Sequence, residues 1–181
     1  ALAVWRSLFF KPTPFVAEAG HSAEWNRGAY LVLGLGHCAA CHSPRNALGA
    51  SGPVNDLSGG LMPMVNWYAP DLTKDKETGL ASTPLAEIVR LLQTGSAAQA
   101  QTSGPMAEVV QHSTQHWQEK DLLAVATYLQ SLAQQAIQHE FAPLSDLRAS
   151  ADYRRQILGQ LLRRAWLEST GHNTVRLEAL A

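Results

Sequence analysis

Two cysteines and a histidine stand together in the segment Cys38-Ala39-Ala40-Cys41-His42. Two thiols at this spacing can each form a thioether with one vinyl group of a haem, and a histidine that follows directly can supply a nitrogen to the iron. The spacing therefore predicts one covalently attached haem c, with Cys38 and Cys41 as its anchors and His42 as an axial ligand.

Two other kinds of site use a pair of cysteines at this spacing. A structural zinc site needs further cysteine or histidine ligands at ordered spacing, and the chain has only two cysteines. A thioredoxin-like redox pair lies between a strand and a helix of a βαβ unit, which the flanking sequence does not suggest. The adjacent histidine therefore favours the haem.

A haem that only carries electrons has a second axial ligand, whereas a vacant position would allow a substrate to bind. We expect Met106 to be this ligand, because an intervening helix could form one wall of the pocket and Pro105 stiffens the loop that delivers the sulfur. A neutral thioether favours the ferrous state. The weaker candidates are Met62, Met64, His37, His112 and His116.

Helical periodicity predicts most of the elements that must position these groups. The expected helices run from residues 22–24 to about 35, from an N-cap at Thr83 to Gly95, through residues 109–110, over 119–135 and over 152–167. Gly28 would allow another helix to approach the first one closely. Residues 49–63 are rich in glycine, serine, asparagine and proline and predict a loop, and no segment predicts a strand.

Composition limits the class of protein. The chain has 181 residues, 46% of them hydrophobic, and a formal net charge of −1, which argues against a nucleic-acid binder. No apolar run reaches the roughly 18–20 residues of a membrane span. We expect an N-terminal arm or interdomain linker over residues 1–23, a haem domain over 24–135 and an extension over 136–181. The arm could pack back on the domain or join it to a preceding one.

Several longer motifs resemble class I cytochrome c, and specifically the last haem domain of the three-haem subunits of membrane-bound bacterial alcohol and gluconate dehydrogenases. The matching segments are residues 25–32, 36–38, 41–46, 67–70, 72–73, 78–80, 104–110 and 113–115, and residues 5–10 are similar to the segment that precedes that domain. The resemblance implies an all-α fold in which helices wrap one haem. It also implies that the helix after residue 24 crosses the helix over 119–135, with Gly28 near Tyr128 or Leu129.

For the site, the resemblance implies axial ligation by His42 and Met106. It further implies that Pro44, Arg45, Trp67 and Tyr68 line the haem or its propionates. Asp71 stands where the family usually has asparagine, which would place a carboxylate near the propionates, and Thr83 replaces a usual tryptophan.

For function, the resemblance implies an electron carrier rather than an enzyme. A dehydrogenase subunit would be the donor, and a quinone, an oxidase or another cytochrome the acceptor. Because haem c is attached outside the cytoplasm, we expect a periplasmic protein whose signal peptide was removed or lies on a longer chain. Membrane association would come through partner subunits. A haem enzyme or ligand sensor with an open sixth position is the alternative.

The end of the chain resembles a different family. Residues 141–154 and 161–164 are similar to the end of the flavin subunit of xanthine-dehydrogenase-type molybdenum enzymes, without its flavin-contacting part. A natural fusion, a gene-assembly artefact and a coincidence would each explain the likeness. An amphipathic helix that packs on a partner needs none of them, and a docking module of a larger molybdo-flavoenzyme complex is a further interpretation.

Overall fold

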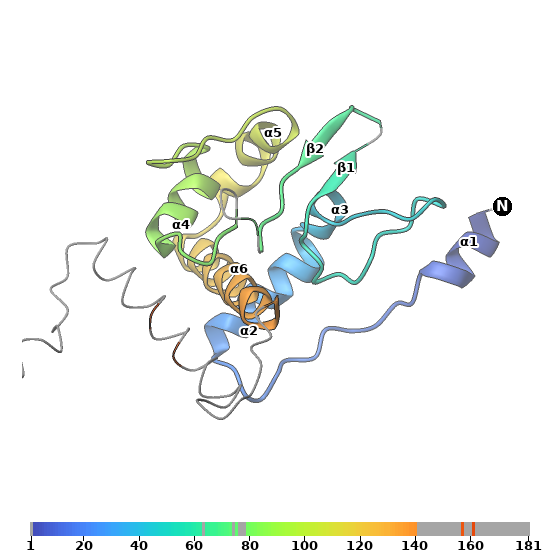
Figure 1. Ribbon diagram of the computed structural model, residues 1–181, viewed down its shortest axis with the longest axis horizontal. Coiled ribbons are helices and arrows are strands. Elements are labelled where there is room, and N and C mark those ends of the chain that lie inside the picture. The colour runs from blue at the N-terminus through green and yellow to red at the C-terminus, as the bar shows by residue number, and fades with distance from the viewer. Residues whose placement is uncertain are drawn as a thin grey trace, which may run out of the picture. The chain divides into compact units, whose positions relative to one another are not determined.

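The protein is mostly helical, as expected from the sequence (Figure 1). The computed structural model describes residues 2–62, 64–73, 75, 79–140, 157 and 161. The elements are α1 (Leu2–Phe9), α2 (Ala23–Tyr30), η1 (Leu31–Leu35), α3 (Ala39–His42), β1 (Gly60–Met62), β2 (Trp67–Ala69), α4 (Leu85–Thr94), α5 (Pro105–His112), η2 (Thr114–His116) and α6 (Glu119–Glu140). The chain divides into two units, residues 1–134 and 135–181. The three-segment division stays a prediction, and the helix expected over 152–167 lies outside the described residues except for Ile157 and Leu161.

Helix α2 is capped at its start, and its continuation η1 has a different helical geometry. The Ser22 side chain accepts a hydrogen bond of 3.1 Å from the amide of Trp25, which satisfies one of the free amides of the first turn. The last turn, η1, is π-helical, and the Gly36 amide donates to the Leu31 carbonyl at 2.6 Å. His37 then has a φ of 51°, so the chain leaves the helix one residue before the first cysteine.

The crossing of α2 over α6 is confirmed. A Cβ atom on Gly28 would lie 2.0 Å from the Ala124 carbonyl oxygen and 2.8 Å from the Cβ of Tyr128, so only glycine fits here. Beside it, the rings of Trp25 and Tyr128 meet edge to face at 4.9 Å, and the Trp25 indole donates to Ser131 at 2.6 Å. The core around the crossing consists of Trp25, Ala29, Leu31, Val32, Leu57, Val125, Tyr128 and Leu129.

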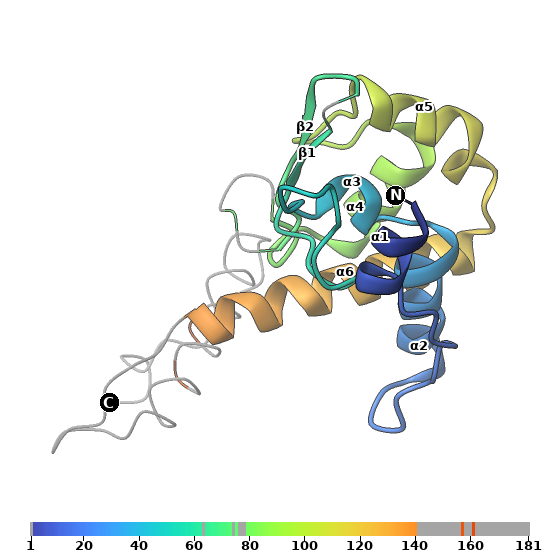
Figure 2. The ribbon, with the colours of Figure 1, turned by 90° about the vertical axis from the view of Figure 1, so that its right-hand side faces the viewer.

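The prediction that the chain has no strands was wrong. β1 and β2 form an antiparallel hairpin in which Gly60 pairs with Ala69, Leu61 with Tyr68 and Met62 with Trp67. Figure 2 shows the hairpin beside α5 at one end of the unit. Strands of three residues are too short to show an alternating pattern, and this pair is held by contacts with residues distant in sequence.

The cap expected at Thr83 was also wrong. α4 begins one residue later, with Pro84 at the cap position and no side-chain hydrogen bond. The end of α4 follows the prediction, because Gly95 has a φ of 76° and closes the helix in the left-handed conformation. In the part of the chain that the structure describes, no helix is both long and apolar enough to cross a membrane.

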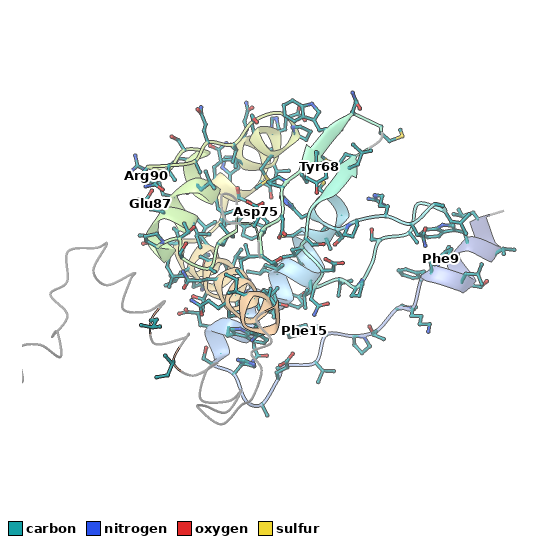
Figure 3. The ribbon with its side chains drawn as sticks, in the orientation of Figure 1. Phe9, Phe15, Tyr68, Asp75, Glu87 and Arg90 are labelled. Atoms are coloured by element: carbon teal, nitrogen blue, oxygen red, sulfur yellow. The ribbon has the colours of Figure 1, made fainter. Side chains whose placement is uncertain are left out.

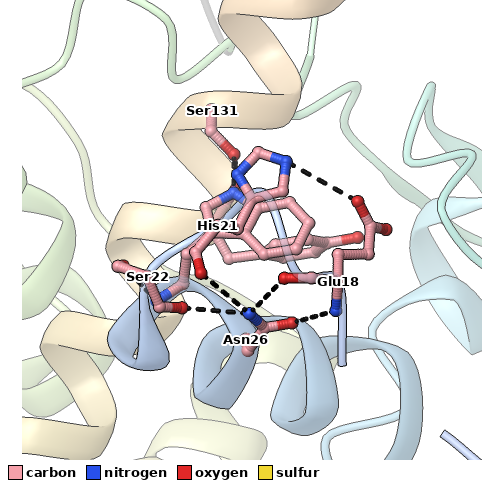
Figure 4. A network of polar contacts seen from close by, with 7 residues as sticks. Glu18, His21, Ser22, Asn26 and Ser131 are labelled. Atoms are coloured by element: carbon pink, nitrogen blue, oxygen red, sulfur yellow. Dashed lines mark hydrogen bonds and ion pairs between the residues drawn. The ribbon is translucent and has the colours of Figure 1, made fainter. Parts of the chain in front are cut away.

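The segment before α2 contacts the rest of its unit at several places, and the Phe15 ring meets the Tyr30 ring edge to face at 5.5 Å. The Trp5 indole of α1 donates to the Leu48 carbonyl at 2.8 Å. Nearer the domain, the His21 ring stacks on Trp25 at 3.7 Å, and Asn26 exchanges hydrogen bonds of 2.7 and 3.0 Å with the backbone of Glu18 (Figure 4). The segment before α2 is thus folded back on the start of that helix.

We predict that Gly28→Ala lowers the free energy of unfolding by about 1–3 kcal/mol, because the new methyl group would overpack the crossing of α2 and α6. Gly34→Ala is the matched control, since nothing lies within 4 Å of a Cβ placed there. That change should be neutral or slightly stabilising. Chemical denaturation of the haem-loaded protein measures both, and equal stabilities would contradict the close crossing.

We predict that stability falls between about pH 10 and pH 12 because of Tyr128. Burial, with the carboxylate of Glu18 as a smaller cause, raises the pKa of Tyr128 to about 12. An unfolded tyrosine titrates near pH 10, so the unfolded state loses its proton first and the contribution of this phenol is lost as the pH rises. Urea denaturation at pH 8 and pH 11 should show a smaller loss in Tyr128→Phe than in the wild type. An identical loss would count against this cause.

Candidate haem-binding site

The two cysteines and the histidine lie in one helical turn. Cys38 is the cap of α3, and its carbonyl accepts hydrogen bonds from the amides of Cys41 at 3.2 Å and His42 at 3.0 Å. Cys38 packs against the core, and burial raises the pKa of its thiol to about 11. The thiol is therefore protonated at neutral pH before any thioether forms.

The His42 ring is oriented by the backbone of Pro70. Its Nδ1 lies 2.8 Å from the Pro70 carbonyl oxygen. A carbonyl can only accept, so Nδ1 carries the proton and the lone pair is on Nε2, the nitrogen left for a metal. Burial lowers the pKa of His42, against the opposing effect of this hydrogen bond, and keeps the ring neutral.

The hairpin is docked directly on the same turn. The Gly59 amide donates to the His42 carbonyl at 2.8 Å. A Cβ atom on Gly60 would lie 2.6 Å from the Cys41 carbonyl oxygen and 2.3 Å from that of Ser43, so the two backbones touch. The start of β1 and the residue after β2 therefore both contact the Cys-His segment.

Met106 lies in the first turn of α5, directly after a loop over residues 96–104 that the same hairpin contacts and that we call the Met106 loop. It is half-buried and is the second residue of α5, after Gly104 and Pro105. A Cβ atom on Gly104 would lie 2.6–2.7 Å from three atoms of the Trp67 indole. The segment from Trp67 to Pro70 thus contacts the His42 ring at one end and the Met106 loop at the other.

The weaker candidates for the sixth ligand occupy different places. Met64 lies in the turn of the hairpin and is 97% exposed, whereas Met62 is half-buried in β1 opposite Trp67. The three histidines His37, His112 and His116 are all exposed. Of the methionines, Met62 pairs with Trp67 in the hairpin, and Met106 follows by two residues the glycine that the Trp67 indole contacts.

Among the other expected haem neighbours, Arg45 has hydrogen-bond partners within the chain. The Arg45 guanidinium donates to the carbonyls of Ala40 at 2.6 Å and Gly49 at 3.0 Å, which closes the loop after α3. Tyr68 is exposed on β2 (Figure 3), and Pro44 is exposed beside Arg45. Contact of Pro44, Arg45, Trp67 and Tyr68 with a haem stays a prediction.

Of the two residues expected to depart from the family pattern, Asp71 makes contacts through its side chain and Thr83 through its backbone. Asp71 Oδ1 accepts hydrogen bonds of 2.6 Å from the amide and 2.7 Å from the hydroxyl of Thr73. The Thr83 carbonyl accepts a hydrogen bond of 2.6 Å from Gln130, which ties the start of α4 to α6. The Asp71 carboxylate thus holds local backbone, whereas the Thr83 contact uses a backbone carbonyl that any residue would supply.

The residues present fit a haem c. Two thiols lie in one turn with a neutral histidine whose Nε2 is free, which is the donor set that covalent attachment and axial ligation need. Within the described ranges, no three His, Cys, Asp or Glu side chains are grouped so that they could hold a metal ion by themselves.

Sequence reasoning missed two residues that build the site. Pro70 orients His42 through its carbonyl, and Gly104 accommodates the Trp67 indole beside Met106. Both residues stand in segments that match the cytochrome c family, residues 67–70 and 104–110. Their positions in these segments were the only signal in the sequence that could have indicated a role in the site. Neither has a side chain that suggests a ligand, and their roles depend on backbone contacts.

Two family models match the chain. The model described as cytochrome c matches residues 26–133. The model described as CO dehydrogenase flavoprotein C-terminal domain matches residues 104–169, which overlaps the end of the first match. The second match agrees with the likeness of the tail to flavin subunits.

Curated proteins of known name are similar over most of the chain. The fructose dehydrogenase cytochrome subunit of Gluconobacter japonicus is 35% identical over 164 residues, 86% of this chain and 33% of that protein. The alcohol dehydrogenase (quinone) cytochrome c subunit of Gluconobacter oxydans is 41% identical over 72% of this chain and 29% of its own length. A nicotinate dehydrogenase subunit of Pseudomonas putida is 40% identical over 82% of this chain and 13% of its own length. The chain spans about a third or less of these relatives.

We predict that haem stays on the polypeptide in denaturing electrophoresis, because Cys38 and Cys41 would hold it by two thioether bonds. The protein must be matured in a host that attaches haem in the periplasm, and the band is then stained for haem peroxidase activity. The double variant Cys38→Ser, Cys41→Ser should lose the stain, while Met64→Ala should keep it. An unstained wild-type band would contradict a haem c.

Proposed function

Because the chain belongs to the cytochrome c family, we propose that it carries single electrons through one covalently bound haem with His42 and Met106 as axial ligands. The observation that carries this proposal is the segment from Trp67 to Pro70. Its carbonyl at Pro70 orients the His42 ring, and its indole at Trp67 packs beside the loop of Met106.

The length of that segment suits one centre with a ligand on each side. Extended chain rises about 3.3 Å per residue, so the three steps from Trp67 to Pro70 span about 10 Å. A haem bound here would supply the one-electron chemistry of its iron. The residues of the chain hold His42 in the tautomer that exposes Nε2 and bring the Trp67 indole against Gly104, two residues before Met106.

We propose that the electron donor is a dehydrogenase subunit and that the acceptor is a quinone, an oxidase or another cytochrome. The names of the relatives support this proposal, since two of them are cytochrome subunits of fructose and alcohol dehydrogenases. A carrier needs no catalytic side chains of its own. We also propose that the protein lies in the periplasm or on the periplasmic face of the inner membrane, because haem c is attached outside the cytoplasm.

A docking role for the end of the chain is a second candidate function. It is favoured by the match of residues 104–169 to the C-terminal domain of a flavoprotein and by the similarity to a subunit of nicotinate dehydrogenase. We propose that residues 136–181 dock the haem domain to a larger molybdo-flavoenzyme subunit. Co-purification with a flavin- and molybdenum-containing partner, lost when residues 141–181 are deleted, would support it.

We predict that Met106→Ala abolishes the far-red charge-transfer band of a ferric methionine-ligated haem. The reduction potential should fall, because a neutral thioether favours the ferrous state. The open position should also let carbon monoxide and cyanide bind readily, where the wild type resists. Absorption spectroscopy, a redox titration and carbon monoxide uptake measure the three effects.

Met62→Ala and Met64→Ala are the controls for this experiment. Both should keep the band and the potential of the wild type. If Met62→Ala loses the band while Met106→Ala keeps it, the ligand is Met62. If the wild type takes up carbon monoxide at once, an open haem site of an enzyme or a sensor becomes the better interpretation.

A further inference from the structure

Trp67 makes a contact that places it next to the sixth-ligand loop without itself offering a ligand. We propose that Trp67 is a positioning residue that fixes the loop of Met106 through its indole. The proposal rests on the proposed ligation by Met106. It goes beyond that ligation by assigning to Trp67, a residue of β2, the stabilisation of the position of Met106.

The contact leaves no freedom at Gly104. This residue has a φ of 51° and a ψ of −133°, a backbone conformation open in practice only to glycine. The space that a side chain would need is filled by Cε2, Cζ2 and Cη2 of the indole, at 2.6–2.7 Å from an ideal Cβ. The indole therefore lies directly against the backbone of Gly104.

Met106 follows this contact by only two residues. Pro105 is the first residue of α5 and restricts φ, so the chain between Gly104 and Met106 has little freedom to adjust. A shift of Gly104 is consequently passed to Met106. The sulfur can hold its position only as well as Gly104 does.

The loop is also fixed at its base. The Thr102 amide donates to the Gly95 carbonyl at 2.8 Å, and its hydroxyl donates to the same oxygen at 3.2 Å. Two residues further on, the chain reaches the indole. The loop is thus held at the end of α4 by hydrogen bonds and at the start of α5 by packing against Trp67.

Trp67 is itself fixed to the turn that carries His42. Its strand ends one residue before Pro70, whose carbonyl accepts the hydrogen bond from the His42 ring. The indole is 44% exposed and does not belong to the buried core. Removing it should therefore loosen the loop of Met106 while the crossing of α2 and α6 remains intact.

The test is Trp67→Leu in the haem-loaded full chain. Leucine keeps an apolar side chain in β2 but lacks the outer ring of the indole. We expect the methionine charge-transfer band to weaken and the apparent affinity for carbon monoxide to rise by about tenfold or more, since the open state becomes more populated. The thermal melting midpoint should change little. If Trp67 had a purely structural role, its replacement would lower the melting midpoint instead.

Leu61→Ala is the matched control on the same hairpin. Leu61 pairs with Tyr68 and is 54% exposed, and its replacement should keep the band and the carbon monoxide affinity of the wild type. If Trp67→Leu does not take up haem, Trp67→Phe is measured instead, because its shorter ring also lacks the atoms that touch Gly104. A weaker band in that variant supports the proposal.

The outcomes separate this proposal from the proposed function. If the wild type shows the band, Met106→Ala loses it and the Trp67 variant keeps both the band and the carbon monoxide affinity, the positioning role is wrong and the ligation stands. If the wild type has no such band, or Met106→Ala keeps it, the ligation by Met106 is wrong and the positioning role falls with it.

Discussion

The hydrogen bond from His42 Nδ1 to the Pro70 carbonyl is the constraint on which the site depends. It fixes the tautomer of the ring and its orientation, and it also fixes where the strand before Pro70 must run. Since β2 pairs with β1, and β1 begins against the carbonyls of Cys41 and Ser43, the whole hairpin is placed by the turn that carries the histidine. The same short piece of chain then reaches the loop of Met106.

Glycine makes each of the close approaches in this arrangement possible. Gly28 lets α2 touch the backbone of α6, Gly60 lets β1 touch the Cys-His turn, and Gly104 lets the Trp67 indole lie against the Met106 loop. At all three positions a Cβ atom would come within 3 Å of its neighbour. The fold therefore joins its core, its cysteine turn and its second loop through backbone contacts, which a change of side chain elsewhere does not easily repair.

The helices could be predicted from the sequence because their apolar residues recur at helical spacing over several turns, as in α4 and α6. The Cys-x-x-Cys-His motif is equally local, since its spacing alone indicates the chemistry. The hairpin could not be predicted, because strands of three residues show no periodicity. Its two strands are held in place by the contacts of Gly59 and Pro70 with His42, which form only after folding. The role of Gly104 was hidden for the same reason, since it depends on a tryptophan 37 residues earlier in the chain.

Different parts of the same unit consequently determine its stability and the geometry of the expected ligands: the core determines the first and the hairpin the second. Cys38 and Ala39 pack against the core formed by α2, η1, Leu57 and α6, so one side of the turn is held by burial of apolar surface. The other side of the turn is held by the hairpin, whose exposed Leu61 and Tyr68 contribute little to that core. Changes in the core should therefore act mainly on the free energy of unfolding. Changes in the hairpin should act on how His42 and Met106 are presented, because the hairpin contacts the turn of His42 and the glycine two residues before Met106.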